Sequence, residues 1–178
     1  MSDTRNIRNL ALVGFMGVGK TTIGHLLAAQ LDFRFVDTDQ LIEAQAGHTI
    51  AEIFAKSGEA TFRELERQVV QALKTYSNTV IATGGGLPCL GDNLAELKTH
   101  ALTVCLWASP ESVYERVRHQ AHRPLLHTPD PLGKIRELLA LREPYYRQAD
   151  ILVSTDTRSP RDLVSLLAYE FRSVVQKS

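Results

Sequence analysis

The stretch Leu10-Ala11-Leu12-Val13-Gly14-Phe15-Met16-Gly17-Val18-Gly19-Lys20-Thr21 decides the fold class. It contains the pattern G-x-x-x-x-G-K-[ST], the phosphate-binding loop of many nucleotide-binding proteins. The residues before the loop, Leu10–Val13, read as a short buried strand, and those after it, Thr21–Leu31, read as an apolar helix. Strand, glycine-rich loop and helix are the setting that this motif needs, so the sequence predicts a P-loop.

The residue types in this loop suit the binding of a nucleotide with Mg²⁺. Glycines let backbone N–H groups turn towards phosphate oxygens, and the start of the following helix adds partial positive charge. Lys20 is expected to reach the terminal phosphates, and the Thr21 hydroxyl to bind Mg²⁺. A glycine-rich turn with a chance lysine is the alternative, which the flanking strand and helix disfavour.

Length and composition limit the classes of protein to consider. The chain has 178 residues, 44% of them hydrophobic, which suits one domain, 1–178, with a full core. Lys and Arg number 20 and so do Asp and Glu, so we expect no nucleic-acid partner. No apolar run approaches the length of a membrane span, and residues 1–9 resemble no signal or transit peptide. Cys89 and Cys105 lack metal-type spacing and are read as reduced thiols of a cytoplasmic protein.

Short apolar runs alternate with helical patterns along the chain. The predicted strands are Leu10–Val13, Phe33–Val36, Val80–Ala82, Leu102–Leu106 and Ile151–Ser154. The predicted helices are Thr21–Leu31, Glu59–Tyr76, Ser109–Arg118, Lys134–Gln148 and Pro160–Val175, with a further short helix after Thr49 and Glu52, which resemble a capping box. This alternation predicts an α/β fold in three layers, with helices on both faces of a parallel sheet and ligands at the carboxyl ends of the strands. The segment 119–133, rich in Pro and His, is expected to form a mobile lid.

A P-loop indicates a nucleotide but not the reaction, so further signals are needed. The guanine-binding pattern N-K-x-D does not occur, since none of the four asparagines precedes a lysine. A small kinase fits the length. Asp37-Thr38-Asp39 is predicted to form a loop after the second strand, where one carboxylate can hold Mg²⁺ and the other can orient the hydroxyl being phosphorylated. Helix capping remains the alternative for one of the two.

Other residues suggest a pocket for a small acid. Gly84-Gly85-Gly86 follows the third strand and would let a substrate approach the backbone, although a flexible turn is also possible. Arg63 and Arg142 can pair with a carboxylate in a fork geometry, and Glu66 lies one helical turn after Arg63. Each arginine alone could equally be a solvated surface charge. Arg123, in Arg123-Pro124-Leu125-Leu126, is a candidate lid arginine that stabilises phosphoryl charge, or part of a plain surface loop.

Taken together, these motifs resemble the shikimate kinase family over nearly the whole chain. The matching features are Gly14 to Thr22, Asp37-Thr38-Asp39, Gly58-Glu59 with Phe62-Arg63-Glu64-Leu65-Glu66, Gly84-Gly85-Gly86, Arg123-Pro124-Leu125-Leu126, and Arg142 with Tyr146. The P-loop alone is common to many families, but the order and spacing of all six features are specific.

The resemblance implies a nucleoside-monophosphate-kinase-like fold with a five-stranded parallel sheet in the order 2-3-1-4-5. It implies transfer of the γ-phosphoryl group of ATP to the 3-hydroxyl of shikimate, in the route to chorismate and the aromatic amino acids. The implied catalytic residues are Lys20, Asp39 and Arg123. The implied ATP-binding residues are Gly17, Val18, Gly19, Lys20, Thr21, Thr22, Arg123 and Arg158. The implied substrate-binding residues are Asp39, Arg63, Gly84, Gly85, Gly86 and Arg142, with Glu66 supporting Arg63. Mg²⁺ would be held by Thr21 directly and by Asp37, through water.

Some features depart from the family pattern or leave other readings open. Many members place an arginine near the position of His119 to stack on adenine; here Arg116 or Arg118 is the candidate substitute. His119, His122 and His127 are read as a solvated loop rather than a metal site. A kinase acting on another hydroxy acid, such as gluconate, and a non-catalytic nucleotide-binding module are the rivals. We expect a monomer.

Overall fold

Five strands form one parallel sheet in the part of the chain that the structure, a computed structural model, describes: residues 5–120 and 127–176. The strands are β1 (Asn9–Val13), β2 (Arg34–Asp37), β3 (Thr79–Ala82), β4 (Ala101–Trp107) and β5 (Ile151–Ser154). Their order across the sheet is β2-β3-β1-β4-β5, which confirms the predicted topology. β1 lies at the centre and pairs with β3 on one side and β4 on the other, so the P-loop leaves the middle of the sheet.

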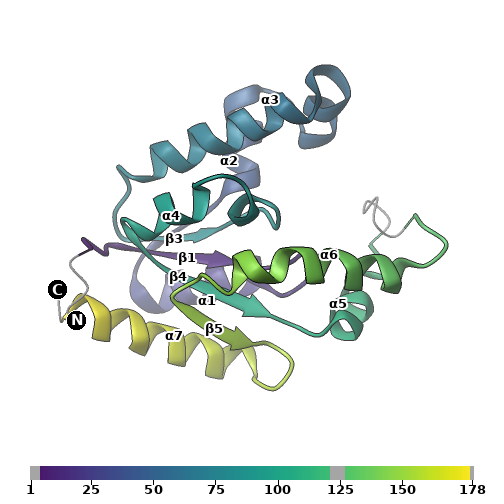
Figure 1. Ribbon diagram of the computed structural model, residues 1–178. Coiled ribbons are helices and arrows are strands. Elements are labelled where there is room, and N and C mark those ends of the chain that lie inside the picture. Colours follow the sequence, from purple (N-terminus) through teal and green to yellow (C-terminus); the bar gives the residue numbers. More distant parts are fainter. Residues whose placement is uncertain (1–4, 121–126, 177–178) are drawn as a thin grey trace.

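Helices cover both faces of the sheet, as predicted (Figure 1). They are α1 (Lys20–Leu31), α2 (Thr38–Ala46), α3 (Ile50–Leu73), the 3₁₀ helix η1 (Leu87–Cys89), α4 (Asn93–Lys98), α5 (Pro110–Val117), α6 (Pro131–Tyr146) and α7 (Pro160–Val175). In the view of Figure 1, α1 and α7 lie below the sheet, and α3 and α4 lie above it. Two hydrophobic cores lie on the two faces of the sheet, and alternate residues of β1 pack into each of them. Leu10 and Leu12 pack on one face, and Ala11 packs on the other.

Side-chain caps explain where several helices begin. The Ser109 and Ser159 hydroxyls accept hydrogen bonds from the N–H groups of Ser112 and Asp162, each before a proline at the first helical position. Thr49 forms the predicted capping box with Glu52. These short-range signals therefore placed the starts of α3, α5 and α7 correctly.

The structure corrects several boundaries around the second strand and the long helix. Asp37-Thr38-Asp39 is a junction rather than a loop, because Asp37 ends β2 and Thr38 begins α2, a helix that the sequence analysis did not predict. The short helix after Thr49 and the long helix that follows are joined as α3, with a kink at Gly58 (φ 80°, ψ 176°). The helix ends at Leu73 rather than Tyr76.

On α3, Ala72 is exposed, whereas Glu66 and Val70 are buried. α6 continues through Pro144 to Tyr146. α6 begins at Pro131, so the last residues of the segment predicted as a lid are helical. Arg123 lies outside the described residues.

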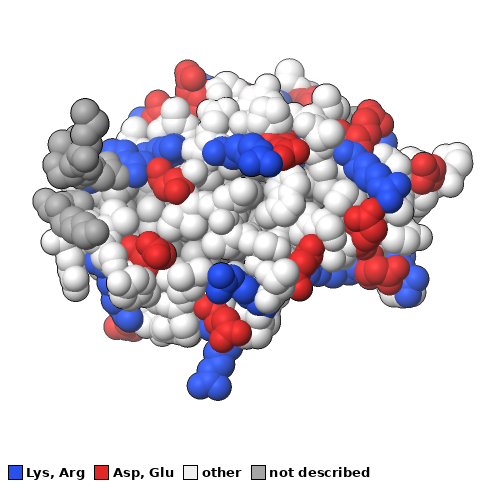
Figure 2. Space-filling model, turned by 60° about the horizontal axis from the view of Figure 1, so that its bottom comes forward, with Lys and Arg blue, Asp and Glu red and all other residues white. Residues whose placement is uncertain are grey.

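Charged side chains of both signs are interspersed on the face shown in Figure 2. Among the described helices, none combines the length and the apolar character needed to cross a bilayer. Neither observation changes the fold class predicted from the sequence.

Candidate active site

A cavity of about 220 Å³ opens at the carboxyl ends of the strands, where an α/β sheet is expected to bind its ligand. It joins three motifs that are far apart in the sequence: the P-loop, the two aspartates after β2, and the glycines after β3. The lining residues are Met16, Gly17, Gly19, Lys20, Thr21, Thr22, Asp37, Asp39, Thr83, Gly84 and Gly85.

The P-loop packs tightly against the neighbouring strand. Gly14 has φ 134°, and a β-carbon placed on it would lie 2.3 Å from the Leu106 carbonyl oxygen, so this position requires glycine. Lys20 Nζ donates to the carbonyl oxygens of Gly14 (2.8 Å) and Phe15 (2.7 Å), across its own loop. α1 starts after Gly19 without a side-chain cap, so no side chain competes with an anion for its first-turn N–H groups.

The two aspartates after β2 have different environments. Oδ1 of Asp37 accepts a hydrogen bond from the Asp39 N–H at 2.9 Å and caps α2. The capping alternative is therefore correct for Asp37, although the residue also lines the cavity. Asp39 lies in the first turn of α2, and its carboxylate faces the glycine segment, because a β-carbon on Gly84 would lie 2.6 Å from Oδ1.

The glycine segment is where the predicted acceptor residues meet. A β-carbon on Gly85 would lie 3.5 Å from Nη1 of Arg142. One on Gly86 would lie 3.4 Å from Nη1 of Arg63 and 3.8 Å from Nη2 of Arg142. Both guanidinium groups and the Asp39 carboxylate therefore surround three consecutive backbone positions.

Carboxylates on α3 hold Arg63 in this position. Nη1 of Arg63 donates to Oε2 of Glu66 at 2.7 Å, and Nη2 donates to Oε1 of Glu59 at 3.0 Å. Glu66 is 1% exposed, and burial raises the pKa of its carboxyl group, while the Arg63 guanidinium acts in the opposite direction. Glu66 and Glu59 thus hold the Arg63 guanidinium from two sides.

Arg142 is anchored differently, from α6. Its guanidinium carbon lies 5.4 Å from the centre of the Phe15 ring, so the side chain extends over a residue of the P-loop. One turn further along α6, the Tyr146 hydroxyl donates to the Gly85 carbonyl oxygen at 2.6 Å. The acceptor arginine and the glycine segment are therefore connected through the same helix.

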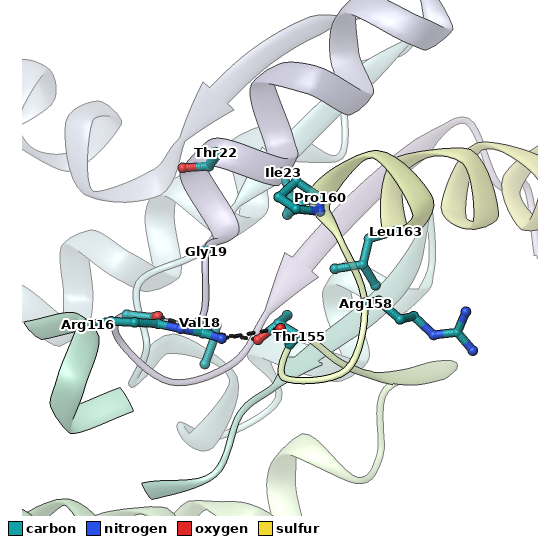
Figure 3. Close-up of a pocket in the computed structure, with 10 residues that line it drawn as sticks. Val18, Gly19, Thr22, Ile23, Arg116, Thr155, Arg158, Pro160 and Leu163 are labelled. Atoms are coloured by element: carbon teal, nitrogen blue, oxygen red, sulfur yellow. Dashed lines mark hydrogen bonds between the residues drawn. The ribbon is translucent and has the colours of Figure 1, made fainter. Parts of the chain in front are cut away.

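A second cavity, of about 280 Å³, shares Gly17, Gly19 and Thr22 with the first and is shown in Figure 3. It is partly apolar, as a site for a planar base would be, and is lined by Gly17, Val18, Gly19, Thr22, Ile23, Arg116, Thr155, Arg158, Pro160 and Leu163. Arg158 borders this cavity, but its guanidinium points away from the other labelled side chains in Figure 3.

Of the two arginines proposed to substitute near His119, Arg116 lines this second cavity. It donates to Thr155 Oγ1 at 2.9 Å and pairs with Asp156 at 3.2 Å, whereas Arg118 pairs with Glu115 on its own helix. The sequence analysis missed Thr155 and Pro160. The Ser-Pro helix start was the one signal that could have placed Pro160 at this edge.

The lid arginine and the loop histidines are not part of the site that the structure describes. Arg123 and His122 lie outside the described residues. His119 and His127 are exposed, and in the described part of the chain no three His, Cys, Asp or Glu side chains gather as a metal site would require.

A P-loop beside a carboxylate, with two arginines converging on a glycine segment, defines a small P-loop kinase with an acidic acceptor. The chain belongs to the shikimate kinase family, whose model, described as shikimate kinase, matches residues 16–173.

Comparisons with individual proteins agree with this membership. The shikimate kinase of Symbiobacterium thermophilum is 48% identical over 88% of this chain and 92% of the relative. That of Hahella chejuensis is 44% identical over 96% of this chain and 91% of the relative. The solved shikimate kinase of Acinetobacter baumannii, in complex with shikimate, has a TM-score of 0.86 at 38% identity and covers 95% of both chains. A gluconokinase from Sinorhizobium meliloti, at 13% identity and a TM-score of 0.62, shares the fold alone.

Proposed function

We propose that this protein transfers the γ-phosphoryl group of ATP to the 3-hydroxyl of shikimate, giving shikimate 3-phosphate and ADP. The observation that carries the proposal is the convergence of Asp39, Arg63 and Arg142 on Gly84–Gly86, beside the P-loop cavity. Shikimate carries a carboxylate for the two arginines and ring hydroxyls for Asp39, so its chemistry matches this arrangement.

On the donor side, the P-loop residues Gly17 to Thr22 hold the phosphates, and Lys20 stabilises the charge that develops on the γ-phosphoryl group. Thr21, Asp37 and Asp39 present oxygen atoms to one cavity, which suits Mg²⁺. Thr21 would hold the ion directly and Asp37 through water; when bound, Mg²⁺ neutralises phosphate charge. The second cavity, called the base cavity below, holds adenine, with Arg116 at its wall and Arg158 at its rim.

On the acceptor side, Arg63 and Arg142 hold the carboxylate, and Glu66 keeps Arg63 in place. Asp39 aligns the 3-hydroxyl towards the γ-phosphoryl group and accepts its proton or orients it. The glycine segment lets the ring approach the backbone. Arg123 is assigned to the lid, where it adds positive charge to the transferring group.

The test is ADP release from MgATP with shikimate, gluconate, a nucleoside monophosphate or no acceptor. We expect strong stimulation by shikimate alone. Stimulation by gluconate would keep a P-loop kinase but replace the acceptor assignment. ATP binding without stimulation by any acceptor would favour a non-catalytic nucleotide-binding module.

We further infer that the protein is a cytoplasmic monomer of one domain. Two cysteines that are not bonded to each other support a reducing compartment. Sedimentation at micromolar concentration tests the monomer, and a mass near 40 kDa, about twice the 19.8 kDa of one chain, would refute it.

A further inference from the structure

Three consecutive residues after β3 are each hydrogen-bonded to a different part of the active site. The Thr83 N–H donates to the Leu12 carbonyl oxygen in β1 at 3.0 Å. The Gly84 N–H donates to Oγ1 of Thr38, the first residue of α2, at 2.9 Å. The Gly85 carbonyl oxygen accepts from the Tyr146 hydroxyl, at the end of α6, at 2.6 Å. The segment is thus joined to the strand before the P-loop, to the helix of Asp39 and to the helix of Arg142.

The hydrogen bond from Tyr146 to Gly85 constrains the position of the Gly85 peptide. Tyr146 is fully buried, so water does not compete for its hydroxyl. Burial raises the pKa of this phenol, so the group stays protonated and remains a donor. Arg142 lies one turn earlier on α6, so both side chains leave the same face of the helix.

Gly85 also lies between the acceptor site and the P-loop. A β-carbon on Gly85 would lie 3.5 Å from Arg142 Nη1, 3.5 Å from the Gly14 carbonyl oxygen and 3.5 Å from the Met16 amide nitrogen. The Gly85 backbone is therefore packed between the acceptor arginine and the P-loop backbone. A shift of this peptide would change the distance between the two sites.

Resting on the function proposed above, we propose that Tyr146 is a positioning residue of the acceptor site. Its hydroxyl fixes the Gly85 peptide relative to α6, so that Arg142 holds the acceptor carboxylate at a set distance from the P-loop. Tyr146 acts through Gly85 and Arg142 and is not assigned a contact with either substrate. Loss of the hydroxyl should therefore weaken acceptor binding and leave unchanged the second cavity, which neither Tyr146 nor Gly85 lines.

The experiment compares Tyr146→Phe with Tyr145→Phe in steady-state assays in which shikimate and ATP are varied separately. Tyr145 is the adjacent residue on α6 and is 43% exposed, so the control removes the same atom from a surface side chain. We expect Tyr146→Phe to raise the KM for shikimate about three- to tenfold, the range for one lost hydrogen bond, with the KM for ATP within about twofold of wild type. Tyr145→Phe should match wild type in both.

The outcomes separate positioning from a structural role. Equal changes in both KM values would show a general loss of structure and overturn the proposal, as would an unchanged KM for shikimate in a folded Tyr146→Phe protein. If Tyr146→Phe does not fold, 4-aminophenylalanine at position 146, which still donates a hydrogen bond, should keep the KM for shikimate within about twofold of wild type. A tenfold increase in that variant would overturn the proposal. If wild type shows no shikimate-dependent ADP release, it is the proposed function that fails, not the role of Tyr146.

Discussion

Gly84→Ala offers a direct test of how Asp39 is aligned. The β-carbon of alanine at this position would lie 2.6 Å from Oδ1 of Asp39, far inside ordinary contact. The Gly84 N–H is tied to Thr38 at 2.9 Å, so the backbone resists moving and the carboxylate must yield. To reach the 3.4 Å at which ordinary contact begins, Oδ1 has to move by about 0.8 Å.

A displacement of this size is large for a group that aligns a reacting hydroxyl. Misplacement by about 1 Å can cost roughly 10²-fold in rate, so we expect kcat to fall by about that factor. If Asp39 acts as the general base, Asp39→Asn should reduce kcat by a factor on the order of 10² or more, because the amide cannot accept the hydroxyl proton. ATP affinity should stay within about twofold in both variants, since the phosphate contacts are assigned to the P-loop.

The double variant shows whether the two changes act through one group. If Gly84→Ala acts by displacing the Asp39 carboxylate, adding it to Asp39→Asn should cause little further loss. The assay is ADP release at saturating ATP and shikimate, with thermal unfolding as the control for folding. A Gly84→Ala enzyme with kcat within about threefold of wild type would refute the steric argument. Multiplicative losses, about 10⁴-fold in the double variant, would refute the shared cause.

Three further predictions concern other parts of the molecule. Arg63→Lys should raise the KM for shikimate about tenfold and leave that for ATP nearly unchanged, because Lys lacks the guanidinium fork; equal losses would make Arg63 structural. Arg116→Ala should weaken nucleotide binding, measured by calorimetry, about tenfold. Arg158→Ala should change it less than threefold, because the Arg158 guanidinium points away from the cavity. The reverse order of effects would contradict the geometry of the base cavity. Burial lowers the pKa of His100 to about 4 from 6.5. Between these two pH values His100 is neutral in the folded state and protonated in the unfolded state. The stability of the protein should therefore fall as the pH drops from 6.5 to 4. The loss is at most about 3 kcal/mol, and in urea titrations His100→Gln should flatten this dependence; identical slopes would exclude His100 as its source.

Sequence reasoning succeeded where local chemistry dictates structure. The P-loop, the serine caps before Pro110 and Pro160, and the alternation of strands and helices each depend on residues a few positions apart. The sheet order, by contrast, came from the family resemblance and not from these local signals. The position of Asp37-Thr38-Asp39 after the second strand pointed to the carboxyl ends of the strands, and the structure brings Asp39 together with Arg63 and Arg142 around Gly84–Gly86.

The failures have identifiable physical causes. α2 begins inside Asp37-Thr38-Asp39, whose chemistry suggested a loop although Asp37 also serves as the helix cap. α4, Asn93–Lys98, is too short to show a periodic pattern.

Side-chain partners could not be predicted either, because they depend on tertiary packing. Nothing local to Tyr146 indicates that its hydroxyl meets Gly85, which precedes it by 61 residues. Arg116 and Arg118 look equivalent in the sequence, and only the loop after β5 decides which of them faces the base cavity.

The kink at Gly58 has a consequence for how this family can vary. A β-carbon there would meet nothing within 4 Å, so space does not demand glycine, but the backbone angles, φ 80° and ψ 176°, do. The bend in α3 therefore depends on the backbone torsion angles of Gly58 and not on its neighbours. One substitution at position 58 is therefore enough to put the direction of the preceding helical turns under strain, although a side chain there would meet no steric clash.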